Sequence, residues 1–152
     1  MENAYRCLGE NGRLGIVLSN SIASIDRWVE ARKWLLGKMR IVALFDLPVT
    51  AFADAVVNTT LVIAYRPSDS ELKRLQEQDY EVFTKKIQRI GYEVRTIRRI
   101  KHYHQIYRVD DNFEVAIDAE GKQVLDEEFT ETIKEFKEWT LGQEETLQKL
   151  FL

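Results

Sequence analysis

Residues 40–67 of this 152-residue chain, RIVALFDLPVTAFADAVVNTTLVIAYRP, decide its fold. They contain two nearly continuous apolar runs, residues 40–47 and 59–65, and a proline follows each of them. Short runs rich in Val, Ile, Leu and Phe are typical of strands that are buried on both faces. We therefore expect two strands, joined by a loop over residues 48–58.

A third apolar run lies upstream, LGIVL at residues 14–18, and predicts a further strand. Between this run and residue 40, apolar side chains recur at helical spacing over residues 25–39. Strand, helix and strand in this order are typical of an α/β layer fold. The sequence thus predicts an α/β domain over residues 1–67, with three strands.

The character of the chain changes after Pro67, where charged residues become frequent. Residues 69–90 and 127–151 follow a helical pattern, and residues 92–109 are basic and strand-like. A hairpin turn is expected around residues 119–122, which read AEGK. We expect residues 68–152 to form a mixed helical and hairpin extension that serves as a docking region.

The composition agrees with a folded domain outside the membrane. Hydrophobic residues make up 45% of the chain and aromatic residues 11%, which is enough for a core. No apolar run approaches the roughly 20 residues that cross a bilayer. Cys7 is the single cysteine, so no internal disulfide can form, and the amino terminus does not resemble a signal peptide. A cytoplasmic location is expected.

Charge is unevenly distributed, although the net charge is only −3. Residues 85–108 carry eight basic side chains against Glu93 alone, a net charge of +7. Residues 109–152 have a net charge of −9, and residues 1–84 a net charge of −1. A basic segment of this kind is typical of a surface that contacts a polyanion. It is equally suited to pairing with the acidic segment of the same chain, and both interpretations stay open.

Several segments resemble one family when they are taken in order. GRLGIVLSNS at residues 12–21 resembles a GGRLGIVLPNG segment of type I restriction-modification methylase subunits, and RIVALFDLP at residues 40–48 resembles their next strand. Residues 52–63 resemble their TFxxxxVKTSILF segment, and residues 79–92 resemble their distal region. The chain therefore resembles the carboxy-terminal portion of an adenine-specific DNA methyltransferase, the modification subunit of a type I restriction system.

This resemblance implies a partial Rossmann-like sheet whose last strand, residues 59–65, is antiparallel. The complete enzyme binds S-adenosylmethionine through a glycine-rich loop and acts through an Asn/Asp-Pro-Pro-Tyr/Phe tetrapeptide. This chain has neither, because its two prolines are Pro48 and Pro67, and Gly9 and Gly12 follow a helical segment. We therefore expect a fragment with no catalytic residue, which binds no cofactor and is inactive alone.

The resemblance also implies partners and one site residue. The partners are DNA, the specificity and restriction subunits, and the missing amino-terminal half of the methylase. Phe52 stands where the family has an aromatic that stacks on the target base; an ordinary apolar loop residue is the alternative. The basic candidates for contact with DNA or a partner subunit are Lys85, Lys86, Arg89, Arg95, Arg98, Arg99 and Lys101.

The two histidines and the free side of residues 14–18 lead to further expectations. His102 and His104 are two residues apart, which places both on one face of a strand, and we interpret them as solvent-facing rather than as metal ligands. Without an upstream strand, residues 14–18 become a sheet edge, so we expect self-association or pairing with the missing half. A non-enzymatic module that binds DNA or a subunit through residues 68–152 is the alternative function.

Overall fold

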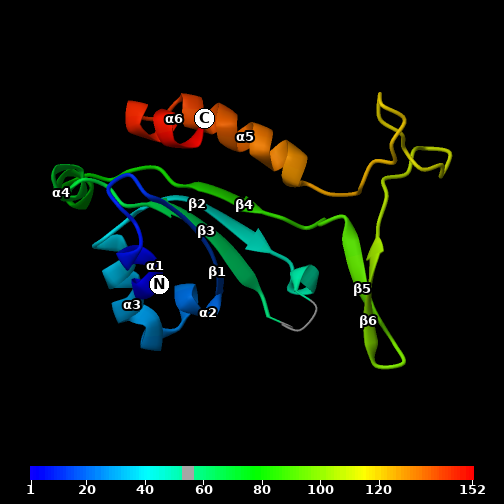
Figure 1. The fold of residues 1–152 in the computed structure, drawn as a ribbon, viewed down its shortest axis with the longest axis horizontal. Coiled ribbons are helices and arrows are strands. Elements are labelled where there is room, and N and C mark those ends of the chain that lie inside the picture. Colours follow the sequence, from blue (N-terminus) through cyan, green and yellow to red (C-terminus); the bar gives the residue numbers. More distant parts are fainter. Residues whose placement is uncertain (53–56) are drawn as a thin grey trace.

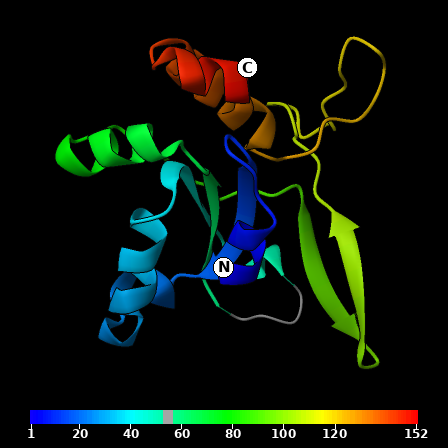
Figure 2. The ribbon, with the colours of Figure 1, turned by 60° about the vertical axis from the view of Figure 1, so that its left-hand side comes forward.

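The computed structural model describes residues 1–52 and 57–152, except for the side chains of Ala23 and Ser24. Within these residues the chain is a mixed α/β protein with a four-stranded sheet and a separate two-stranded ribbon (Figure 1). The strand order in the sheet is β1-β3-β2-β4, and the ribbon consists of β5 and β6. Helices cover both faces of the sheet, so the body has three layers (Figure 2).

The three strands expected from the apolar runs are confirmed. They are β1 (Arg13–Ser19), β2 (Arg40–Leu47) and β3 (Thr59–Tyr65). β3 is antiparallel to both of its neighbours, as expected for the last of the three, and therefore lies between β1 and β2, which run parallel to each other. β1 and β2 are thus joined by β3, which comes after both of them in the sequence.

The helix expected over residues 69–90 is wrong beyond its first half. Helix α4 spans Asp69–Glu77, and the Ser68 hydroxyl accepts a hydrogen bond from the Glu71 N–H at its start. Residues Phe83–Lys86 instead form β4, which pairs in parallel with β2. The Phe83 ring packs against Phe45, Phe136 and Trp139, at centroid distances of 5.5–5.8 Å. These contacts between distant segments outweigh the helical spacing of the local sequence.

The short helices near the amino terminus cover one face of the sheet. They are α1 (Glu2–Arg6), α2 (Ser21–Ser24), the 3₁₀ turn η1 (Asp26–Trp28) and α3 (Val29–Leu36). The expected helix over residues 25–39 is therefore shorter, and it ends at Gly37, whose N–H donates to the Lys33 carbonyl. A second 3₁₀ turn, η2 (Val49–Ala51), follows β2.

The opposite face of the sheet is covered by α5 (Phe129–Leu141) and α6 (Glu145–Phe151). The helix expected over residues 127–151 is thus two helices, interrupted at Gly142. The expected turn around residues 119–122 is confirmed, because the Gly121 N–H donates to the Asp118 carbonyl and Ile117 pairs with Gln123. In the described part of the chain, no helix has the length and apolar character needed to span a bilayer.

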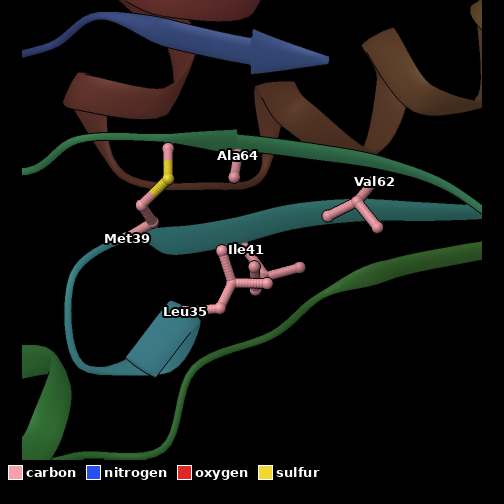
Figure 3. Packing of buried hydrophobic residues seen from close by; sticks show 5 residues of the cluster. All are labelled: Leu35, Met39, Ile41, Val62 and Ala64. Carbon is pink, nitrogen blue, oxygen red and sulfur yellow. The ribbon is translucent and has the colours of Figure 1, made fainter. Parts of the chain in front are cut away.

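The core is divided between the two faces of the sheet. Leu35, Met39, Ile41, Val62 and Ala64 form the cluster beneath α3, where Leu35 approaches Ile41 of β2 (Figure 3). The other cluster contains Val42, Tyr65 and Leu147, packed beneath α5 and α6. Each face of β2 and β3 is therefore buried, which explains why these strands are apolar along almost their whole length.

Candidate functional site

At one end of the sheet β1, β2 and β4 finish and β3 begins, and polar side chains gather there. The Thr60 hydroxyl lies 2.7 Å from Asp46 Oδ1 and 2.8 Å from Asn20 Oδ1. The Asn20 N–H donates to the Asn58 carbonyl at 3.0 Å. These bonds hold the start of β3 against the ends of β1 and β2.

A cavity of about 510 Å³ opens beside this polar cluster, between α3 and the ends of β2 and β4. Its apolar walls come from the sheet and from α3, and Asp46, Thr60 and Lys86 add polar groups. Arg32 is fixed at one side, because its Nη1 donates to the Ile22 and Ile25 carbonyls at 2.6 and 3.0 Å. The apolar lining of the cavity is Leu18, Ile22, Leu35, Leu36, Ile41, Leu44 and Val62.

Phe52 lies at the same end of the sheet, directly after η2. Its side chain is 42% exposed, and its neighbours 53–56 fall outside the described residues. The Tyr92 hydroxyl, from the base of the ribbon, donates to the carbonyl of the adjacent Ala51 at 2.6 Å. The structure therefore brings the Phe52 loop and the ribbon together, and the role of Phe52 as a base-stacking wall stays a prediction.

The seven basic candidates separate into three groups. Lys85 pairs with Glu135 at 2.6 Å, and Arg89 lies 3.2 Å from Glu128 and 3.5 Å from Asp126. For these two cations, pairing with the acidic segment of the same chain is what the structure contains. Lys86 lines the cavity, and the remaining four, Arg95, Arg98, Arg99 and Lys101, lie on the ribbon.

Electrostatics support this separation. The hydrogen bond to Glu135 raises the pKa of the Lys85 ammonium. The backbone N–H of Gln88, which donates to Glu128, lowers the pKa of that carboxyl, and the N–H and charge of Arg89 add to this effect. The charges at the start of the basic segment thus serve to attach β4 and the ribbon base to the distal segment.

The ribbon is formed by β5 (Tyr92–Ile97) and β6 (Ile100–Gln105). Every residue of β6 is exposed. His102 and His104 lie on one face, as expected, with ring centroids 6.4 Å apart. The two-residue turn consists of Arg98 and Arg99, with φ values of 51° and 67°. Sequence reasoning missed this turn, because neither position carries the Gly or Asn that usually accompanies positive φ.

A buried charge network was also missed. Arg40 is only 1% exposed; its guanidinium pairs with Glu144 at 3.0 Å and lies over the Tyr80 ring. Burial works to raise the pKa of the Glu144 carboxyl, but Arg74 and Arg40 outweigh it and hold that pKa below its ordinary value. Burial and a hydrogen bond to Glu71 raise the pKa of the Tyr65 phenol. The network joins β2 to the start of α6 and is a structural link.

Metal ligation finds no support in the part of the chain that the structure describes. Within residues 1–52 and 57–152, no three His, Cys, Asp or Glu side chains come together in a way that would hold a metal ion. Cys7 is exposed and unbonded to another cysteine.

No family model matches this chain, and no curated protein matches it either.

Proposed function

We propose that this chain is the closing portion of an adenine-specific DNA methyltransferase, of the kind that serves as modification subunit in type I restriction systems. In this proposal it supplies the last strands of the methylase sheet and a docking extension. It is inactive alone and acts when paired with the half that carries the reactive groups.

The arrangement of β1, β3 and β2 is the observation that supports this proposal most. In the family that the sequence resembles, the fifth strand lies between the fourth and an antiparallel last strand. β1 corresponds to that fifth strand and β3 to the last one, and β3 is antiparallel to β1 along seven paired residues, Arg13 with Tyr65 through Ser19 with Thr59. Among the described residues, β1 has no partner on its other side, where the fourth strand belongs.

The exposure of apolar side chains on β1 and on the segment that follows it supports the same conclusion. Val17 of β1 is 42% exposed, and Ile25 and Trp28 of the following segment are 44% and 38% exposed. Unpaired strand edges and exposed apolar groups are surfaces that proteins usually cover. We assign the upstream half of the methylase as the partner that covers them.

The chain's own glycines do not fit S-adenosylmethionine. Gly9 and Gly12 lie between α1 and β1, whereas a cofactor loop follows a strand and opens a helix. A Cβ at Gly12 would lie 2.8 Å from the Gly9 carbonyl oxygen, so Gly12 is closed by its own backbone rather than open to a ligand. The cofactor therefore belongs to the partner half. Adenine methylation requires the base to leave the duplex, and Phe52 is the residue of this chain proposed to contact it.

The test pairs this chain with the polypeptide encoded immediately upstream, which the proposal requires to carry the glycine-rich loop and the tetrapeptide. We expect the chain alone to give no calorimetric heat with S-adenosylmethionine and no transfer of a tritiated methyl group to duplex DNA. We expect the mixture to sediment as one complex and to transfer the label. Binding of S-adenosylmethionine by the chain alone, or an upstream sequence without those motifs, would contradict the proposal.

An edge variant makes this test specific. Val17→Lys places a charge on the exposed edge strand, which disfavours pairing with another strand. Leu141→Lys makes the same change at a 62% exposed position of α5, away from β1, and serves as the matched control. We expect the first variant to lose complex formation and the second to keep it. If both variants form the complex equally well, the partner does not cover the β1 edge.

A further inference from the structure

The β5–β6 ribbon projects from the body of the molecule as an arm (Figures 1 and 2). The exposure of its residues increases from base to tip along β5, and β6 is exposed throughout. The base, by contrast, is anchored: the Gly91 N–H donates to the Asp126 carbonyl at 3.0 Å and the Ile106 N–H to the Gly91 carbonyl at 2.9 Å. An anchored base with an exposed tip is the geometry of a segment that reaches toward a partner.

The charge of the arm selects the kind of partner. Residues 92–105 hold four cations, Arg95, Arg98, Arg99 and Lys101, against Glu93 alone. No acidic residue occurs between Glu93 and Asp110 in the sequence. Within the described chain, no carboxylate forms an ion pair with Arg98 or Arg99, whereas Lys85 and Arg89 are paired with the distal segment. A polyanion is the complementary partner.

The conformation of the tip also favours a binding role. Two-residue hairpin turns with positive φ at both positions favour Asn and Gly, and here both positions are arginine. Residues held in such strained conformations gather at sites of function. Ile97 and Ile100, which flank the turn, are 50% and 63% exposed and gain nothing from the core. The tip thus combines two cations with two apolar side chains at the cost of a less favourable turn.

We propose that the β5–β6 ribbon is a DNA-binding arm whose tip, Ile97–Ile100, enters the major groove of a duplex. The choice of DNA rests in part on the proposed function. Two paired strands are about 5 Å apart, and the major groove of B-form DNA, about 12 Å wide, accommodates a two-stranded ribbon. Six residues of strand extend about 20 Å, which exceeds the groove depth of about 8.5 Å. The arginines of the tip contact phosphates or guanine edges, and the isoleucines contact thymine methyl groups.

The anchoring of the arm relates it to the Phe52 loop. The Tyr92 hydroxyl holds the Ala51 carbonyl, one residue before Phe52. The Tyr92 and Tyr103 rings pack 5.7 Å apart on the arm face opposite to Arg95 and His102. The base of the arm therefore lies beside the loop that carries the proposed base-stacking residue.

The experiment measures binding of the full chain to a 20-base-pair DNA duplex labelled with fluorescein, by anisotropy, across a series of NaCl concentrations. The test variant combines Arg98→Asn with Arg99→Gly, which removes both tip cations and introduces the pair of residues that this turn favours. The hairpin is thereby retained, so a loss of binding is not a loss of fold. Lys134→Gln with Lys137→Gln, two exposed positions of α5, removes the same charge elsewhere.

We expect the tip variant to bind at least about tenfold more weakly at 0.1 M NaCl. The negative slope of the logarithm of the association constant against log [NaCl] should become less steep by about 1.8, the value for two phosphate contacts. The α5 variant should bind within about twofold of the unmodified chain, and an RNA duplex, whose major groove is deep and narrow, should compete poorly. Equal losses in both variants, equal competition by RNA, or no DNA binding by the unmodified chain would each overturn the proposal. None of these measurements needs S-adenosylmethionine or the upstream half. A failure of the DNA-binding arm is therefore distinguishable from a failure of the proposed function.

Discussion

The sheet body and the β5–β6 ribbon are built from the same kind of secondary structure with opposite use of side chains. In the body, Val42, Ala64, Tyr65 and Leu147 are completely buried. In the ribbon, all six residues of β6 are exposed, and only the base of β5 is covered. The body is stabilised by apolar burial, whereas the ribbon is held by its own cross-strand pairing and its anchored base.

Charged side chains also differ between the two regions in how far the fold holds them. Several cations of the body are fixed by the fold: Arg40 pairs with Glu144, Lys85 pairs with Glu135, and Arg32 donates to backbone carbonyls. On the ribbon, Arg95 pairs with Glu93, and the two turn arginines stand in a strained conformation. If the ribbon binds DNA as we propose, stability and recognition belong to different regions, and substitutions in one region should leave the other nearly unchanged.

The largest expected effect concerns the core of the body. Leu147→Ala removes a completely buried side chain beneath the sheet and should lower the free energy of unfolding by about 2–5 kcal/mol. The matched change on the ribbon, Ile100→Ala at 63% exposure, should change it by less than about 0.5 kcal/mol. Urea unfolding followed by tryptophan fluorescence measures both. Equal effects of the two variants would show that the ribbon belongs to the cooperative core.

A smaller effect is expected from the charge network of the body. Glu144→Gln weakens the ion pair of the buried Arg40, and because Glu144 is itself 38% exposed we expect a loss of about 1–3 kcal/mol at pH 7. The pKa of Glu144 is lower in the folded state, so its contribution is complete above the unfolded-state pKa of about 4.3 and is lost as the pH falls through the depressed value. The difference in free energy of unfolding between the unmodified chain and Glu144→Gln, measured by urea unfolding, should therefore become smaller from pH 7 to pH 3. A difference that is constant with pH would contradict this role.

The smallest expected effect is on the ribbon alone. Arg98→Asn combined with Arg99→Gly relieves positive φ at two arginines and should stabilise the tip by about 1 kcal/mol or less. Hydrogen exchange should slow at the amides of Ile97 and Ile100, which flank the turn and pair with each other, and remain unchanged in β2. Slower exchange in β2 as well would mean that arm and body open together, so that the ribbon would not be an independent region.

β2 and β3 could be predicted because both of their faces are covered, so that their sequences are apolar along almost the whole length. β1 could be predicted from its apolar run, although every second residue of it is exposed. β4 escaped prediction, because its sequence FTKK alternates between the Phe83 side, which packs on α5, and an exposed side. The break at Gly142 was missed for a related reason: both flanking segments have helical spacing, and only their packing on the sheet separates α5 from α6.

The candidate site was predictable as a composition but not as a set of contacts. Sequence reasoning selected seven cations as one group, and the structure divides them, because Lys85 and Arg89 lie near the acids of a segment about 40 or 50 residues away. The proximity of Phe52 to the ribbon follows from the bond between Tyr92 and Ala51, which no local pattern indicates.

The positions of β1, β2 and β3 and the separation of basic from acidic segments follow from the amino-acid order alone, because apolar runs and charge runs are properties of neighbouring residues. Folding places β4 beside β2, buries Arg40 against Glu144, and leaves part of the basic segment on an exposed arm, none of which a local pattern indicates. The physical reason is that strand pairing and ion pairing are decided by which distant segments become neighbours on folding, and that choice depends on the packing of the whole chain.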